Sequence, residues 1–114
     1  MATTATGSEK RVSPRTDKIP HPDVGALDLA TVMRVVGDPI RLDIVRLLAD
    51  GEARVCSDIQ HAVGLPTSTC SYHLKLLREA GVTRSRAAGT NRLITLRFDD
   101  LEERFPVLLG VLTA

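Results

Sequence analysis

The sequence lacks the features that mark secreted, membrane-spanning or disulfide-linked proteins. Its 114 residues include only two cysteines, Cys56 and Cys70, too few for a disulfide framework or a four-thiolate metal site, which fits a reducing compartment. No run approaches the roughly 20 consecutive apolar residues of a membrane span. The first ten residues also lack the apolar core of a secretory signal. These absences predict a cytoplasmic protein with no membrane partner.

Sequence patterns for catalysis are missing as well. There is no glycine-rich phosphate loop and no pair of carboxylates placed to form a cleft for acid–base chemistry. Ser71 and His73 lie close in sequence, but on a helix their directions differ by about 200°, so they cannot act as nucleophile and base. A chain of this length builds one domain, without a deep active site beside its core. We therefore predict that the protein is not an enzyme.

The small net charge hides an uneven distribution. The chain has a formal net charge of +1, yet residues 66–97 carry six basic side chains against the single acid Glu79, a local charge of +5 that leaves −4 for the rest. A cationic region on a nearly neutral protein is expected where one face meets a polyanion.

Residues 1–24 differ in composition from the remainder. They are rich in Thr, Ser and Pro and show no helical or strand periodicity, which predicts a disordered tail followed by one domain over residues 25–114. Four basic residues of the tail could contact phosphates: Lys10, Arg11, Arg15 and Lys18. Three acids, Glu9, Asp17 and Asp23, nearly cancel that charge, so a passive tail is the favoured interpretation.

Apolar periodicity and capping residues predict four helices before residue 81. The first runs from about residue 26 to Gly37, and the second follows with Asp38 as N-cap and Pro39 at its first position. A short third helix covers about 55–63, and a fourth covers about 67–80. The fourth has two faces: Cys70, Leu74, Leu77 and the neighbouring Leu76 point inward, and Ser68, Ser71, Tyr72 and Lys75 point outward.

Two strands and a last helix complete the pattern. Residues 82–87 and 92–98 alternate as strands, and residues 88–91 form a link of hairpin length. Asp99 and Glu102 form a capping box that opens a helix with an apolar stripe. The order of elements predicts an α+β, mostly α, winged helix-turn-helix with about five helices and a two-stranded β-hairpin wing.

Two runs of residues make a family resemblance specific. Gly37-Asp38-Pro39-Ile40-Arg41-Leu42, followed by Ser71-Tyr72-His73-Leu74-Lys75-Leu76-Leu77-Arg78-Glu79-Ala80-Gly81-Val82, resembles the ArsR/SmtB family of bacterial winged-helix transcription regulators. The resemblance covers about residues 26–112. It implies a homodimer built mainly from the first and last helices, DNA recognition by the fourth helix, and regulation by metal ions or other small signals.

The chain departs from the metal-sensing members of that family. Many of them carry a cysteine pair at the third helix, whereas Glu52–Ile59 offers only Cys56 here, and the last helix has carboxylates but no histidine or cysteine. We therefore predict no required cofactor, and only a weak or partner-assisted response to Ni or Zn. The candidate ligands for such a weakly bound metal are Cys56, Asp58, His61 and His21. Pro66 replaces the family's usual serine before the recognition helix, so Thr67 or Ser68 is expected to cap it.

The predicted contacts follow from the fourth helix and the hairpin. The expected DNA contacts from the helix are Thr67, Ser68, Thr69, Ser71, Tyr72, His73 and Lys75, of which Thr69 and His73 line the DNA backbone. The expected contacts from the wing are Arg84, Arg86, Thr90, Asn91 and Arg92. The expected dimer interface consists of Leu27, Met33, Val36, Leu101, Phe105, Leu108, Leu109 and Leu112.

The favoured function is a sequence-specific regulator that binds a palindromic operator as a homodimer and responds to a signal, either directly or through a protein co-regulator. One alternative is a winged-helix protein-interaction module, which would have little use for the basic stretch. The other is a redox-sensing regulator, which requires Cys56 and Cys70 to have Cα atoms within about 7 Å. Cys70 falls on an apolar face, which favours a buried, inert thiol.

Overall fold

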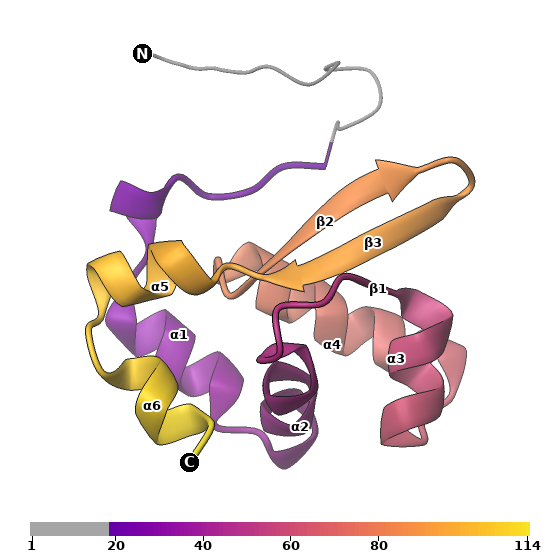
Figure 1. Cartoon of the computed structure of the whole chain (residues 1–114), viewed down its shortest axis with the longest axis horizontal. Coiled ribbons are helices and arrows are strands. Elements are labelled where there is room, and N and C mark those ends of the chain that lie inside the picture. The colour runs from indigo at the N-terminus through magenta and orange to yellow at the C-terminus, as the bar shows by residue number, and fades with distance from the viewer. Residues whose placement is uncertain (1–18) are drawn as a thin grey trace.

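The computed structural model describes residues 19–114, in which helices pack beneath a three-stranded antiparallel sheet (Figure 1). In chain order the elements are the 3₁₀ helix η1 (Val24–Ala26), α1 (Leu29–Val36), α2 (Pro39–Leu48), β1 (Arg54–Val55), α3 (Cys56–Val63), α4 (Thr67–Glu79), β2 (Thr83–Ala88), β3 (Asn91–Leu96), α5 (Phe98–Arg104) and α6 (Leu108–Leu112). The winged helix-turn-helix fold is confirmed. In this part of the chain no helix is long and apolar enough to cross a membrane.

Aspartate caps fix the beginnings of the first two α-helices. The Asp28 carboxylate accepts a hydrogen bond from the Thr31 backbone N–H at 3.0 Å. The Asp38 carboxylate accepts from Ile40 and Arg41 N–H groups, also at 3.0 Å. These bonds satisfy N–H groups that have no partner inside the helix. The start of α2 at Pro39 is therefore confirmed, with Asp38 as its cap.

The four helices α1, α2, α3 and α4 share one apolar core with the sheet and with the two C-terminal helices α5 and α6. Its fully buried members include Val32, Ile44, Leu48, Ile59 and Leu77. The core also contains four residues expected at the dimer interface: Leu27, Val36, Leu101 and Leu109. That part of the interface prediction is wrong, because these side chains are already covered within a single chain.

The sheet has one strand more than the sequence predicts. Its order is β1-β3-β2, so the hairpin β2–β3 forms the wing and β1 pairs with the other edge of β3. Arg54 lies opposite Ile94, and Val55 lies opposite Leu93. We expected Val55 to begin the third helix, but a two-residue strand has no periodicity of its own, and only its pairing with β3 defines it.

The single C-terminal helix expected from the sequence is two helices. α5 ends at Arg104, and α6 begins at Leu108. Pro106 lies between them, and proline cannot supply the N–H that a continuing helix requires. Val107 then adopts φ 79°, an unusual value for a β-branched residue. Asp99 is not the cap of α5, because Arg97 precedes its first residue and no side chain caps it.

The N-terminal residues described by the structure contact the wing. The Ser85 backbone N–H donates to His21 Nε2 at 3.0 Å, and Arg97 Nη1 donates to the Pro22 carbonyl at 2.8 Å. His21 is therefore half-buried rather than simply solvated. The rest of the predicted disordered tail, residues 1–18, lies outside the described residues.

Both the backbone conformation and the space around Gly81, just after α4, favour glycine. Its φ is +84°, and an added Cβ would collide with Cδ2 of the buried Leu27. We expect Gly81→Ala to lower the free energy of unfolding by about 2–4 kcal/mol, the sum of left-handed strain and overpacking.

Gly64→Ala is the matched control for that substitution. Gly64 also has a positive φ, +70°, but open space surrounds its added Cβ. It should lose only about 1–2 kcal/mol of unfolding free energy in urea titrations. Equal losses in the two variants would contradict the close packing of Leu27 on Gly81.

Candidate nucleic-acid interface

The turn between α3 and α4 holds the two helices at a fixed angle. Gly64 takes the left-handed conformation at the end of α3, and the Gly64 and Leu65 N–H groups both donate to the Gln60 carbonyl. Thr67 Oγ1 donates to the Gln60 side chain at 3.1 Å. The expected capping of α4 by Thr67 or Ser68 is wrong, because Pro66 occupies the N-cap position and no side chain caps the helix.

The outer face of α4 is exposed, polar and free of acids near its start. Ser68, Ser71, Tyr72 and Lys75 are all exposed, as is Thr67, and Thr69 is half-buried. Tyr72 keeps 58% of its surface accessible. The predicted separation of this face from the buried Cys70, Leu74 and Leu77 is confirmed. The structure thus brings six of the seven predicted helix residues to one accessible region.

His73 is the exception, because it points into the protein. It is 8% exposed, and Arg41 Nη1 lies 3.0 Å from His73 Nδ1. The Arg41 Nε also donates to the Val35 carbonyl at 2.6 Å. A guanidinium has donors but no acceptor, so His73 Nδ1 must accept and the ring proton must reside on Nε2. The predicted DNA-backbone contact by His73 does not fit this buried, bonded position.

The wing presents arginines by strict alternation. Thr83 and Ser85 of β2 are buried, whereas Arg84 and Arg86 between and beyond them are exposed. Thr90 lies in the turn, and Asn91 and Arg92 begin β3, all of them exposed. The five predicted wing residues therefore share the hairpin as expected.

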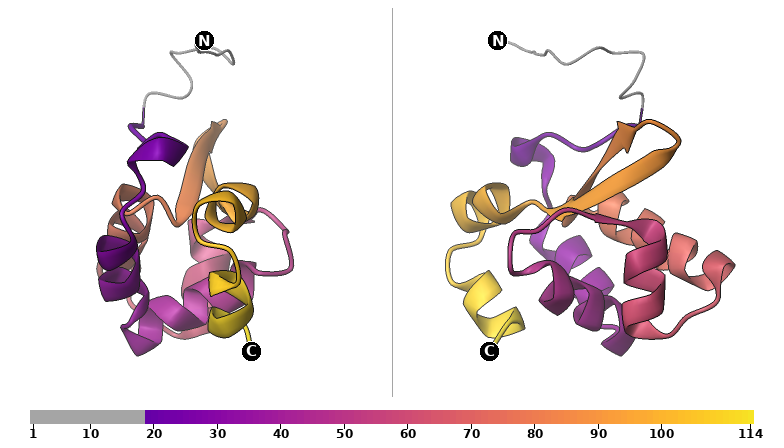
Figure 2. Two further views of the ribbon diagram at one scale, coloured as in Figure 1. Left: turned by 90° about the vertical axis from the view of Figure 1, so that its left-hand side faces the viewer. Right: turned by 45° about the vertical axis from the view of Figure 1, so that its right-hand side comes forward.

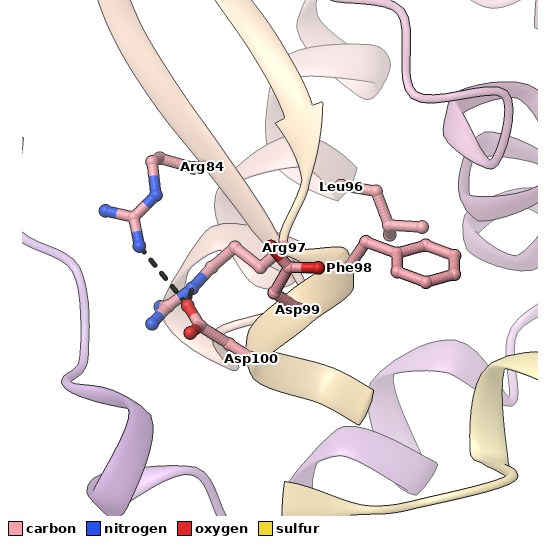
Figure 3. Close-up of a pocket in the computed structure, with 6 residues that line it drawn as sticks. All are labelled: Arg84, Leu96, Arg97, Phe98, Asp99 and Asp100. Carbon is pink, nitrogen blue, oxygen red and sulfur yellow. Dashed lines mark hydrogen bonds and ion pairs between the residues drawn. The ribbon is translucent and has the colours of Figure 1, made fainter. Parts of the chain in front are cut away.

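An acidic side chain holds the base of the wing. Asp100 Oδ2 accepts from Arg97 Nε at 2.9 Å and lies 3.4 Å from Arg84 Nη2, and Figure 3 shows Arg84 and Asp100 pointing toward one another. These residues, with Leu96, Phe98 and Asp99, line a hollow of about 260 Å³. Burial lowers the pKa of Arg97, and its bond to Asp100 acts in the opposite direction.

The positive charge that faces solvent is smaller than the local charge of +5 counted from the sequence over residues 66–97. Arg97 is 5% exposed, so it neutralises Asp100 inside the fold instead of facing solvent. Arg84 also forms an ion pair with that carboxylate, at 3.4 Å. Lys75, Arg86 and Arg92 are exposed.

The elements separate into two ends of the molecule. α3 and the wing tip lie at one end, and α1, α5 and α6 gather at the other (Figures 1 and 2). The wing tip therefore lies away from the C-terminal helices.

The cysteine and metal-ligand candidates do not assemble into a site. Within residues 19–114 no group of three or more His, Cys, Asp or Glu side chains is placed to hold a metal ion. Asp58 and His61 are exposed on α3, Cys56 is half-buried at its start, and His21 lies against β2. Burial raises the pKa of both thiols, and Cys56 adds to the effect at Cys70. A raised pKa lowers thiolate content and therefore reactivity.

Comparisons with known proteins agree with this geometry. A family model described as a helix-turn-helix domain matches residues 36–86. The chain is 32% identical over 84 residues to the HTH-type transcriptional regulator YceK of Bacillus subtilis, covering 73% of this chain and 84% of YceK. It is 31% identical over 75 residues to the arsenical resistance operon repressor of Staphylococcus xylosus, covering 66% and 71% of the two chains.

A solved structure is similar in fold and sequence. It is the homodimeric winged helix-turn-helix DNA-binding domain of Mb0332 from Mycobacterium bovis, a possible ArsR-family transcriptional regulator. The TM-score is 0.63 at 29% identity, with 73% of this chain and 76% of that chain covered.

The contact between Arg41 and His73 predicts a single tautomer. Long-range ¹H–¹⁵N NMR spectra of the folded protein should show His73 protonated on Nε2 only, whereas exposed His61 should show the tautomer mixture of a free imidazole. Arg41→Leu should release that constraint and lower the free energy of unfolding by about 1–3 kcal/mol. A proton found on His73 Nδ1 would contradict the assignment.

Proposed function

The chain belongs to the ArsR family of winged helix-turn-helix transcriptional regulators, and from this premise we propose that it binds a palindromic DNA operator as a homodimer. The observation that carries the proposal is the outer face of α4, exposed beside an arginine-bearing wing and without an acid in the first turn of the helix. A helix with small polar side chains enters the major groove, where base edges display a distinct pattern for each base pair. Such a protein acts on DNA rather than as an enzyme, and we place it in the cytoplasm with its DNA.

In the proposed complex the outer face of α4 reads bases. Ser68, Ser71, Tyr72 and Lys75 have the exposure that base contacts require, and Thr67 and Thr69 lie at the helix start, where phosphates are reached. Arg41 contacts His73 on the inner side of α4, where the apolar core also holds the helix. An outer face that is already oriented in this way lowers the entropic cost of binding.

The wing supplies contacts to phosphates. Arg86 and Arg92 are exposed, and no carboxylate among residues 19–114 forms an ion pair with either. Arg84 must share its guanidinium between Asp100 and DNA. Thr90 and Asn91 lie at the turn, which is the part of a wing that reaches furthest along the duplex.

The proposed dimer uses the end opposite the wing tip. Leu29 and Met33 of α1 are 46% and 54% exposed, and Val107 and Val111 near α6 are 73% and 65% exposed. Phe105, Leu108 and Leu112 of the predicted interface are half-buried beside them. A two-fold axis through this end would space two recognition helices for successive major grooves, about 34 Å apart. Such a dimer matches a palindromic operator.

We propose further that operator binding requires no metal. Within residues 19–114, Cys56, Asp58, His61 and His21 form no group of three ligands, which weighs against a tight site in one chain, so any response to Ni or Zn would be weak or partner-assisted. The raised pKa values of Cys56 and Cys70 weigh against a thiolate-based redox sensor. A signal would then reach the regulator through a partner chain or a co-regulator.

Substitutions on α4 and on the wing should have different effects on DNA binding. Tyr72→Ala should cost about 1–3 kcal/mol on an operator selected from genomic fragments, and little on unrelated duplex. Arg86→Ala should weaken both alike and reduce the salt slope by about one unit per contact. Arg84→Ala is the matched control, with a smaller effect because Asp100 already engages that side chain.

These measurements should be made in the presence of a chelator, so that they also test the metal proposal. Operator preference that survives Tyr72→Ala would reject the assignment of α4. Binding that appears only after Zn or Ni is added would reject the metal-independent operator. Absence of DNA binding in every condition would favour a protein-interaction module instead.

The proposed dimer can be tested by measuring the mass of the intact chain and of a variant at an exposed residue of α1. Light scattering of the intact chain at micromolar concentration should give twice the chain mass. Met33→Glu places a charge in the proposed apolar contact and should weaken dimerisation by at least about tenfold. Ala53→Glu, at an exposed position before β1, should leave the dimer intact. A monomeric mass for the intact chain would overturn this part of the proposal.

A further inference from the structure

A groove where α1, α2 and α4 meet is used neither by the proposed DNA contacts nor by the proposed dimer. It encloses about 320 Å³. The residues that matter for its chemistry are Arg34 and Val35 of α1, Arg41 of α2, and Leu76, Glu79 and Ala80 of α4. Its volume lies at the small end of the range for pockets that hold small molecules, about 300–1,000 Å³.

The groove is separate from both proposed interfaces. On a helix of about 3.6 residues per turn, Arg34 and Val35 lie about 100° and 200° further round than Met33, so they face away from the apolar side proposed for the dimer. On α4 the groove uses residues 76–80, whereas the proposed DNA contacts end at Lys75. A molecule in the groove therefore need not displace DNA or a second chain.

The inner wall of the groove is apolar. Val35 and Ala80 are 8% and 5% exposed, and Leu76 is half-buried between the core and the surface. These side chains come from the two helices that face each other across the groove. They can cover the apolar body of a ligand, which is the usual composition of a small-molecule pocket with a few polar groups to orient its occupant.

The rim of the groove carries more positive than negative charge. Arg41 Nε and Nη1 are engaged by the Val35 carbonyl and the His73 ring, and within residues 19–114 its Nη2 has no hydrogen-bond partner. Arg34 is exposed, and in the same part of the chain its side chain forms no hydrogen bond or ion pair. The one acid on the rim, Glu79, is exposed and can turn toward water.

Two guanidinium groups with unused donors match a carboxylate. Guanidinium and carboxylate form short, charge-assisted hydrogen bonds, which are stronger than those between neutral groups. Arg41 is also held in place by its two existing bonds, so binding a ligand through Nη2 costs little further ordering of that side chain.

We propose that the groove binds a small organic carboxylate with an apolar body. Arg34 and Arg41 hold the carboxylate, and Val35, Leu76 and Ala80 cover the body. The binding does not rest on the proposed DNA-binding function. In a regulator of this family, the groove would admit a direct signal that is neither a metal ion nor an oxidant.

The test uses hexanoate and phenylacetate as probes of the intact chain. Methyl signals in ¹H–¹³C NMR spectra are followed up to about 10 mM probe, a range in which a millimolar Kd is measurable. The methyl groups of Val35, Leu76 and Ala80 should shift along one saturable curve. Acetate, which lacks the apolar body, and 1-hexanol, which lacks the charge, should bind at least about tenfold more weakly. Absence of saturable shifts with both probes would overturn the proposal.

Two substitutions on the rim should have opposite effects on hexanoate binding. Arg34→Met keeps much of the apolar stem and should weaken binding about three- to fivefold, as expected for an exposed ion pair. Glu79→Gln removes a like charge and should strengthen binding about twofold. Weaker binding by Glu79→Gln would contradict a carboxylate ligand.

Arg46→Met is the matched control. It makes the same change of charge on α2, but Arg46 lies outside the groove and donates to the Leu112 carbonyl. Its hexanoate affinity should equal that of the intact chain. Equal weakening by Arg34→Met and Arg46→Met would show a general attraction of anions and overturn the site. Urea unfolding of Arg34→Met should match that of the intact chain, because Arg34 is exposed. No DNA is present in these measurements, so their failure leaves the proposed function in place.

Discussion

The Arg41 guanidinium links three parts of the molecule that must keep a fixed relation. It extends from α2, donates to the carbonyl of Val35 near the end of α1, and donates to the His73 ring on the inner side of α4. A buried carbonyl or imidazole without its partner would cost free energy, so the bonds are costly to break. Ser71, Tyr72 and Lys75 face outward because the opposite side of α4 is held inside the fold, by this contact and by the apolar core.

The wing is fixed by a second charged arrangement. Arg97 is almost fully buried at the end of β3, where it binds Asp100 and the Pro22 carbonyl together. The same Asp100 reaches Arg84 on the outer face of β2. Asp100 therefore links the start of α5 to the base of the wing, and Arg97 links both to Pro22.

Several features of the fold could be predicted because their causes are local. Asp38 and Pro39 specify the start of a helix through their own side chains, and alternation along β2 places Arg84 and Arg86 on one face. The two faces of α4 follow from the helical period. Pro106 is a local signal for the break between α5 and α6, whereas the apolar stripe across it predicts one helix. β1 had no local signal, since only β3 gives Arg54 and Val55 their conformation.

The sequence by itself determined the helix-turn-helix order, the wing and the polar face of α4, because capping, periodicity and the family motif act over short stretches of chain. The tertiary structure decided which apolar and charged side chains are buried within a single chain and which remain on its surface. Leu27, Val36, Leu101 and Leu109 became core instead of interface, His73 turned toward Arg41, and Arg97 became a buried partner of Asp100. Periodicity shows that a stripe must be covered, but only packing between distant segments shows whether the chain itself or a second copy covers it.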